Sequence, residues 1–553
     1  MTRGLCTKRL SVSRFCKIFV QVPQTVSSAL ESAYDCIATQ VDRFASRQYL
    51  AWFPGSPEFA PILFPSQIAV KPDSGTEMQN AQLLIEEASK IATAYLAGND
   101  DRREPVARRV SASELQERFD LAPPREGRPL EQLLDDVRTT LHYSVRTGHP
   151  GFSNQLFGDQ DAAGLLGDWM TALLNTSMYT FEVAPVVTLM ELELLRHMCS
   201  FVGWSPEEGE GVLTPGGSIA NLMAVLAARH RHFPHVREEG LRAEDKPVLF
   251  VSKEGHYSVE RAALIAGIGT ARVRKIAVDE VGRMLPEALE EAIQAALAAG
   301  ENPFLICATA STTIAGAYDP VDKLADIAGR HGMWLHIDGA CGGSALLSSK
   351  HRGLLRGSER ADSMAWNPHK MMGVPLTCSA ILLRERGLLE ETNAMHADYL
   401  FHQSPDSHLD LGDRSLQCGR RVDALKLWLS WQALGDDGHS ARIDQLFEVA
   451  ATLRSMLKER EGFEIVREPE GCNTCFHFVP ESLRNVPPSA ARSEQLGKLA
   501  IEVRERLHTE GRILMNYAPL DGVPVFRHVA NNHRTDVEDL SFLLNEIERL
   551  AQA

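Results

Sequence analysis

The sequence predicts an α/β protein, with a mostly parallel sheet in a large domain and a small α/β domain at the C-terminus. Between about residues 160 and 385, apolar runs of strand length alternate with segments of helical periodicity. Such alternation is typical of a parallel sheet covered by helices on both faces. Past about residue 440, a long amphipathic segment precedes two short apolar runs and a closing helix. This change of pattern predicts the separate small domain.

The large domain is expected to hold five candidate strands with helices between them. Helices are expected, for example, over 286–299 and 321–331, and the strand candidates are 248–252, 304–309, 334–337, 363–366 and 379–383. In the small domain we expect a helix over 443–460, strands over 475–479 and 525–530, and a helix over 537–551. Ligands of open α/β sheets bind beyond the carboxyl ends of the strands. The residues that follow the strands are therefore the first candidates for a functional site.

We expect four parts along the chain. Residues 1–77 form a loosely ordered extension, whose first 30 residues carry five basic side chains and no acidic one. That bias resembles an organelle transit peptide. Residues 78–159 form an N-terminal helical segment, the large domain spans 160–435, and the small domain spans 436–553.

Composition excludes several classes of partner. The 553-residue chain has a net charge of −16, with 44% apolar and 24% charged residues. Neither nucleic acid nor an anionic membrane surface is expected as a partner of so acidic a chain. No apolar run approaches the ~18 residues of a membrane span. The ten cysteines have no regular spacing, which favours reduced thiols and a cytoplasmic location over a disulfide framework.

Two groups of residues could suggest a metal site. The Cys-x-x-Cys sequence at Cys472 and Cys475 could be a redox motif or half of a zinc site. Side chains three apart in a strand point to opposite faces, however, and no second pair exists. His230, His232 and His235 are more simply explained as a polar helix end. We therefore predict no metal.

The most informative stretch is Asn367-Pro368-His369-Lys370, which directly follows the strand candidate 363–366. A lysine just after a buried strand can form a Schiff base with an aldehyde cofactor. Asp338 follows an earlier strand candidate, and its carboxylate could hold a pyridine nitrogen in the protonated form. Lys370 and Asp338 are thus the two fixed points that pyridoxal 5'-phosphate (PLP) chemistry needs. The sequence predicts PLP as the cofactor.

A glycine-rich turn offers a place for the phosphate of this cofactor. The sequence Thr-Pro-Gly-Gly-Ser-Ile-Ala-Asn at 214–221 opens a helix, and the N-terminus of a helix presents free N–H groups to an anion. Gly217 and Ser218 are the expected phosphate contacts. A plain serine N-cap after a glycine turn is the alternative, and the presence of Lys370 favours the phosphate.

Three further residues could hold the ring of the cofactor. His256 follows the strand candidate 248–252 and could stack on one face of the pyridine, although a lone histidine there is more often structural. Ala340 is small enough to lie against the opposite face. Thr312, at the end of 304–309, could form a hydrogen bond to the ring hydroxyl.

These motifs resemble the group II PLP-dependent decarboxylases, the family of the glutamate, cysteine-sulfinate and aromatic-amino-acid decarboxylases. The resemblance covers roughly residues 80 to 550 and includes, besides the tetrad, His149-Pro150, Asn154-Gln155-Leu156, Asn175-Thr176, Glu182-Val183-Ala184-Pro185 and Gln417-Cys418-Gly419-Arg420-Arg421-Val422-Asp423. It implies PLP fold type I and a homodimer with sites at the interface, against which residues 78–159 would pack.

The resemblance also implies roles for single residues. Lys370 would carry the cofactor, Asp338 would pair with the pyridine nitrogen, and His256 would stack on the ring. Asn367 and His369 would help to hold the phosphate region. Tyr399 resembles the tyrosine of a mobile loop that protonates the α-carbon, and Arg527 matches the arginine that binds a substrate carboxylate. By default a loop tyrosine is a surface aromatic, and Arg527 could instead form a surface ion pair.

The substrate is expected to be a short acidic L-amino acid. Gln155 and Phe157 lie in one candidate substrate segment, and Ser177 in another. Cysteine-sulfinate decarboxylases resemble this chain in carrying Phe and Ser at positions 157 and 177, and Phe fills the space that a longer chain would occupy. The expected reaction is α-decarboxylation of cysteine sulfinate, aspartate or both, giving hypotaurine or β-alanine. Gly339 and Cys341 depart from the residues common after the aspartate, which leaves the shape of the pocket open.

Three alternatives remain at this stage. A glutamate decarboxylase would release γ-aminobutyrate. An aminotransferase would use the same fold and cofactor but release a keto acid. A protein that kept the fold without activity would serve as a binding partner, and the presence of Lys370, Asp338, His256 and Arg527 argues against it.

Overall fold

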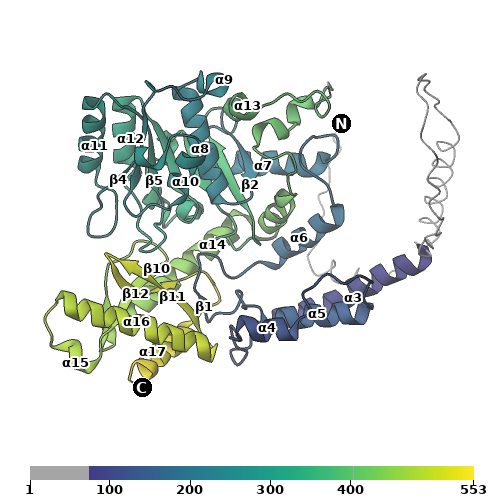
Figure 1. Ribbon diagram of the computed structural model, residues 1–553, viewed down its shortest axis with the longest axis vertical. Coiled ribbons are helices and arrows are strands. Elements are labelled where there is room, and N and C mark those ends of the chain that lie inside the picture. The colour runs from purple at the N-terminus through teal and green to yellow at the C-terminus, as the bar shows by residue number, and fades with distance from the viewer. Residues whose placement is uncertain (1–73, 403, 553) are drawn as a thin grey trace, which may run out of the picture. The chain divides into compact units, whose positions relative to one another are not determined.

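A computed structural model of the chain describes residues 74–402 and 404–552 (Figure 1). The predicted extension, 1–77, lies outside the described residues except for its last four, which fall in helix α3 (Ser74–Gly98). Residues 75–553 cluster as one unit. Among the described residues, no helix is both long and apolar enough to cross a membrane.

The large sheet has seven strands in the order β2-β8-β7-β6-β5-β3-β4 (Figure 1). Only β8 runs antiparallel to its neighbours, so the prediction of a mostly parallel sheet is confirmed. The strands are β2 (Glu210–Thr214), β3 (Pro247–Ser252), β4 (Val273–Ile276), β5 (Asn302–Thr309), β6 (Trp334–Gly339), β7 (Ser363–Trp366) and β8 (Ser379–Leu383). The five predicted strands are β3 and β5 to β8. The sequence did not reveal the two edge strands, β2 and β4; β4 is only partly buried and carries an arginine and a lysine.

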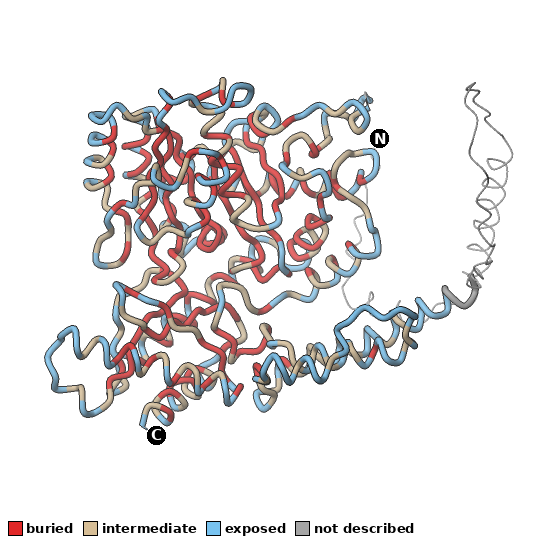
Figure 2. Tube along the Cα trace, in the orientation of Figure 1, coloured by how far each residue is buried: buried red, intermediate tan, exposed pale blue. Residues whose placement is uncertain are grey.

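Alternating side chains of the strands feed two apolar cores, one on each face of the sheet. Val248 and Phe250 belong to one core and Leu249 to the other. The first core is completed by α7 (Pro185–Val202), α11 (Pro286–Ala298), α12 (Val321–His331) and α14 (Asp423–Glu459). The second is completed by α8 (Gly217–His232), α10 (Ser258–Ile265) and α13 (Leu388–Asn393). In Figure 2 the buried residues concentrate along both sheets.

Helix α14 contacts α7 beside the large sheet and also reaches the small sheet. It begins 20 residues before the predicted helix 443–460 and is interrupted at Gly435, whose φ of 63° is not helical. Such a positive φ is accessible to glycine at little cost. The predicted boundary between the large and small domains, 435/436, therefore falls inside this helix, at its interruption.

The small sheet has five strands in the order β1-β11-β12-β10-β9. Its strands are β1 (Phe152–Ser153), β9 (Phe463–Ile465), β10 (Asn473–Phe478), β11 (Leu514–Leu520) and β12 (Val523–Val529), and α16 (Ala490–Glu510) and α17 (Val537–Gln552) pack on it. Strand β1 comes from the N-terminal segment and pairs in parallel with β11, with Phe152 opposite Leu514. A strand of only two residues has no detectable hydrophobic period, so the sequence could not predict it.

The rest of the N-terminal segment holds three helices, α3, α4 (Ala112–Arg118) and α5 (Leu130–Tyr143), joined by irregular stretches. Helix α4 begins with a capping box between Ser111 and Glu114. Helix α6 (Ala162–Leu174) follows and packs on α14.

Candidate active site

Several predicted site residues lie at the carboxyl edge of the large sheet because they stand at or soon after strand ends. Asp338 is the last residue but one of β6, Asn367 follows β7, and His256 follows β3. Between β2 and α8 the chain turns at Gly216, where the backbone φ is 140°, a region that disfavours residues with a side chain. Gly217 is then the first residue of α8.

These strand ends surround a cavity of about 190 Å³. The seven predicted residues that line it are Gly217, Ser218, His256, Asp338, Ala340, Asn367 and Lys370. The fold thus brings residues from motifs spread over more than 150 positions together around one cavity. Leu156, from the predicted substrate segment, also lines it, as does Cys341.

Two residues expected to touch the cofactor do not line this cavity. The Thr312 hydroxyl accepts the backbone N–H of Ala317 at 3.0 Å, whereas Ser311 and Thr313 line the cavity instead. His369 turns its Nδ1 to the backbone N–H of Cys378, 3.0 Å away. Burial lowers the pKa of His369 to about 4, so the imidazole is neutral and offers no charge to a phosphate. Both residues lie close to the ends of strands, as expected, but their side chains point away from the cavity.

Four more predicted residues do not line the cavity. Tyr399 is 80% exposed. The Ser177 hydroxyl accepts the backbone N–H of Arg420 at 3.0 Å. The ring of Phe157 packs beside Phe152, with their centroids 6.2 Å apart. Gln155 is also exposed and contributes only its backbone carbonyl to a hydrogen bond.

Asp338 is held by a residue that the sequence did not single out. Asn221 donates from Nδ2 to Asp338 Oδ2 at 2.8 Å, and its Oδ1 lies 3.0 Å from His336 Nε2. Burial lowers the pKa of His336 to about 4, so this histidine is neutral and can donate to the amide oxygen. Asn221 lies four residues after Gly217 and hence on the same face of α8. This four-residue spacing from Gly217 is the feature of the sequence that could have identified Asn221.

Burial also favours the neutral form of His256. Burial lowers the pKa of His256, with the nearby charge of Lys370 acting in the same direction and that of Asp338 opposing it. Its Nδ1 accepts the backbone N–H of Ser258 at 3.2 Å. The ring therefore keeps one orientation at the wall of the cavity.

Arg527 lies beside the cavity, on β12 of the small sheet. Its guanidinium donates to the carbonyl of Thr313 at 3.0 Å and to that of Asn154 at 2.7 Å. The residue is 5% exposed, and burial lowers its pKa. No acidic side chain among the described residues pairs with it, and its Nε has no hydrogen-bond partner there. A buried cation without a counter-ion is costly, so Arg527 is suited to binding an anionic group.

A larger cavity, of about 350 Å³, holds none of the predicted residues. It is lined in part by His149 and His528. His528 neighbours Arg527 on β12, and successive strand residues point to opposite faces. The larger cavity thus lies behind the small sheet, away from Lys370 and Asp338.

The cysteine and histidine groups show no sign of metal chemistry. Cys472 and Cys475 are buried free thiols, and burial raises the pKa of each. Within the described part of the chain, no cluster of three or more His, Cys, Asp or Glu side chains is arranged to hold a metal ion.

Known proteins match this chain over most of its length. Residues 113–479 match the family described as the pyridoxal-dependent decarboxylase conserved domain. The chain is also 46% identical, over 475 residues, to the Homo sapiens protein named cysteine sulfinic acid decarboxylase, a match covering 85% of this chain and 94% of that relative. The chain belongs to the family of pyridoxal-dependent decarboxylases. It is thus a PLP-dependent amino-acid decarboxylase, a carboxy-lyase, as predicted.

Solved structures agree with the predicted fold type I. The chain resembles the crystal structure of mouse CSAD in its apo form, with a TM-score of 0.82 and 44% identity over 85% of this chain and 98% of that one. It also resembles the structure of Oryza sativa TDC with PLP and tryptamine, with a TM-score of 0.79 over 86% and 98% of the two chains. At 24% identity the second likeness shows the fold alone.

The cavity residues fit the cofactor of this family. The buried Oδ1 of Asn367 has no hydrogen-bond partner within the described residues. A Cβ added to Gly217 would come within 2.9 Å of Asn367 Nδ2 and 3.1 Å of the Ala340 side chain, so the glycine keeps this corner open. The free N–H groups at the start of α8 can donate to a phosphate, and the Lys370 amine can react with an aldehyde, so this cavity suits a phosphorylated aldehyde.

Proposed function

We propose that this decarboxylase acts on cysteine sulfinate, giving CO₂ and hypotaurine, with aspartate as a second substrate of the same length. The observation that carries the proposal is Arg527, a buried arginine with no acidic partner among the described residues, beside a cavity lined by Lys370 and Asp338. The identity of 46% to a cysteine sulfinic acid decarboxylase supports the choice of substrate.

Each residue has a part that its surroundings support. PLP, when bound, supplies the electron sink that accepts the electron pair left by departing CO₂. Asp338 places a carboxylate at the floor of the cavity, where Asn221 orients it. Lys370 offers its amine to the aldehyde, and Gly217 and Ser218 present the start of α8 to the phosphate. His256 lines the cavity wall and would cover the ring, and Arg527 would bind a substrate carboxylate.

Tyr399 remains our proposed proton donor to the α-carbon. Its ring is free of hydrogen-bonded partners among the described residues and lies in a segment that rests on 179–181, where Phe401 stacks on Tyr179 at 5.2 Å. The proposal requires a rearrangement that carries the Tyr399 hydroxyl to the cavity. Closure of such a loop would also exclude water.

Phe157 and Ser177 are proposed to set substrate length indirectly. Phe157 packs on a cluster of Val106, Phe152 and Leu514. Because it adjoins Leu156, which lines the cavity, its packing determines how far Leu156 reaches inward. Ser177 fixes its own segment through Arg420, whose buried guanidinium pairs with Glu191.

The test is CO₂ release by the PLP-loaded protein with cysteine sulfinate, aspartate and glutamate side by side. Lys370→Ala serves as the blank. We expect the highest kcat/KM with cysteine sulfinate. A preference for glutamate would contradict the proposed substrate, and keto-acid release without CO₂ would contradict the reaction.

We further propose that the protein is a homodimer. Helix α6 turns its small residues Gly167 and Thr171 toward α14, where a Cβ on Gly167 would lie 2.5 Å from Lys426 Cα. Its large apolar residues face outward and continue onto α7; the exposed set is Leu166, Trp169, Leu173, Val186 and Leu189. An exposed apolar surface of this kind marks an interface.

Light scattering during size-exclusion chromatography tests the dimer. We expect twice the chain mass for the native protein and a shift toward the chain mass for Leu173→Arg. A native protein that elutes with the mass of one chain would contradict the proposal.

A cytoplasmic location also stays a prediction, supported by the free thiols of the seven described cysteines.

A further inference from the structure

We propose that Asn531 is a positioning residue that holds the substrate segment, residues 154–157, against the cofactor cavity. The inference rests on the proposed function and names a residue outside the cavity that sets substrate affinity. It begins from the way in which the segment is held, because apart from β1 the backbone between 148 and 159 belongs to no helix or strand.

Asn531 donates both N–H groups of its amide to this segment. Its Nδ2 donates to the carbonyl of Gln155 at 2.8 Å and to that of Phe157 at 2.9 Å. The two carbonyls flank Leu156, which lines the cavity. Asn531 is 5% exposed, so water does not readily replace these bonds. An irregular backbone near the interior depends on such side-chain donors.

The backbone at the end of the segment also packs closely against Asn531. A Cβ added to the next residue, Gly158, would lie 2.8 Å from the Asn531 Cγ and 3.0 Å from its backbone oxygen. The segment is therefore packed onto the asparagine as well as bonded to it. Asparagine is required for its shape and for its two N–H groups together.

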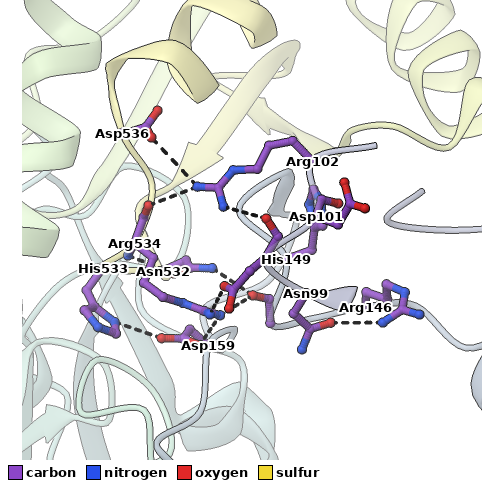
Figure 3. A network of polar contacts seen from close by, with 12 residues as sticks. Asn99, Asp101, Arg102, Arg146, His149, Asp159, Asn532, His533, Arg534 and Asp536 are labelled. Atoms are coloured by element: carbon purple, nitrogen blue, oxygen red, sulfur yellow. Dashed lines mark hydrogen bonds and ion pairs between the residues drawn. The ribbon is translucent and has the colours of Figure 1, made fainter. Parts of the chain in front are cut away.

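The neighbours of Asn531 hold both ends of the same stretch (Figure 3). Asn532 and Arg534 donate to the carbonyl of Gly148 at 3.0 and 2.7 Å. At the other end, Arg534 and His533 each lie 2.8 Å from a carboxylate oxygen of Asp159. With its ends fixed, the stretch can move only in its middle, where Arg527 holds the carbonyl of Asn154 and Asn531 holds those of Gln155 and Phe157.

This arrangement separates substrate binding from cofactor binding. Gly217, Asp338, Asn367 and Lys370 come from the large sheet and α8, and Asn531 contacts none of their segments by a hydrogen bond within the described residues. Losing the Asn531 amide should free Leu156 to shift while the cofactor wall stays in place. We therefore expect KM to change much more than kcat.

The test compares Asn531→Leu with the native enzyme. Leucine keeps the shape but donates no hydrogen bond. We expect KM for cysteine sulfinate to rise by about tenfold, as for the loss of two buried hydrogen bonds. We also expect kcat within about threefold, an unchanged PLP absorbance, and a smaller preference for cysteine sulfinate over glutamate. Asn302→Leu is the matched control, since Asn302 donates to one carbonyl at the start of β5, the end away from the cavity. This control variant should leave KM unchanged.

A second readout does not depend on activity. Amide hydrogen exchange of the peptide covering 154–159 should speed up in Asn531→Leu and not in Asn302→Leu. If the leucine variant does not fold, Asn531→Ser keeps a single donor that cannot bridge both carbonyls, and the same changes are expected. Unchanged KM, selectivity and exchange in a folded variant would overturn the proposal. A native enzyme that releases no CO₂ from cysteine sulfinate would instead overturn the proposed function, and the exchange result would still decide the role of Asn531.

Discussion

The two sides of the active site are built in different ways. The cofactor side is made of strand ends and one helix start, so its residues are placed by the backbone of the large sheet. The substrate side is an irregular stretch held by side chains from nearly 400 positions later, such as Asn531 and Arg534. The comparison teaches that one site can combine a wall fixed by local motifs with a wall fixed only by long-range contacts.

The difference has an energetic side. On the cofactor wall, buried groups such as Asp338 and Asn221 satisfy each other within the large domain. On the substrate wall, Arg527 has no counter-ion among the described residues. The irregular stretch beside it depends on side-chain donors, Arg527 included. The first wall is expected to govern the rate of the chemical step and the second to govern binding.

Removing the charge of Asp338 tests the cofactor wall and should have the largest effect. We expect Asp338→Asn to lower kcat for CO₂ release by about 10²–10³-fold, as when an electrostatic contact to the transition state is lost, with KM nearly unchanged. Steady-state kinetics measures it. Asp326→Asn, the same change at an exposed ion pair with Arg360, is the control. A kcat within threefold of the native value would show that the carboxylate charge is not used.

Removing the charge of Arg527 tests the substrate wall. We expect Arg527→Gln to lower kcat/KM by about 10²-fold, mainly through KM, because a buried charge that binds an ion is worth about 3 kcal/mol. Arg484→Gln, at an exposed pair with Glu461, should change neither parameter. An effect confined to kcat would place Arg527 with the cofactor wall and break the comparison.

The charge of Asp159 should stabilise the substrate wall in a pH-dependent way. Burial alone would raise the pKa of Asp159, but the hydrogen bond from His533 and the charges of Arg442 and Arg534 outweigh it and leave the pKa below its ordinary value. A lowered pKa contributes stability above the unfolded value of about 4, and that stability is lost as pH falls through the folded value.

We expect Asp159→Asn to lower the free energy of unfolding by about 2–3 kcal/mol at pH 7. The difference from the native protein should shrink below about pH 4. Thermal unfolding across pH 3 to about 8 measures it. Asp100→Asn, which loses an exposed pair with the same Arg534, should cost less than about 1 kcal/mol. A difference that stays constant with pH would assign the effect to packing rather than charge.

Closing the phosphate corner should have the smallest effect. We expect Gly217→Ala to weaken PLP binding by about tenfold, since the new methyl group would press on Asn367 and Ala340. Fluorescence titration of the apoprotein with PLP measures it. Gly329→Ala, in α12 with open space around it, should bind PLP normally. Equal affinities would mean that the corner does not hold the phosphate.

Sequence reasoning recovered the cofactor wall better than the substrate wall for a physical reason. A residue after a buried strand must lie at the sheet edge, so Asp338, Asn367 and His256 could be placed from periodicity alone. The direction of a side chain after the strand is set by its neighbours, which is why Thr312 and His369 were expected in the cavity and are not found there. Asn531 carries no local signal, because its partners Gln155 and Phe157 come together only after folding.

The sequence by itself predicted the α/β class, the PLP cofactor, the lysine and aspartate proposed for the chemistry and, through a resemblance, the decarboxylase family. These follow from strand periodicity and from short motifs in which neighbouring residues act together. Tertiary structure alone decided that β1 joins the small sheet, that Arg527 lies unpaired beside the cavity, and that Asn531 holds the substrate segment. Each of these depends on hydrogen bonds or burial between residues hundreds of positions apart, and neither periodicity nor a local motif encodes such a pairing.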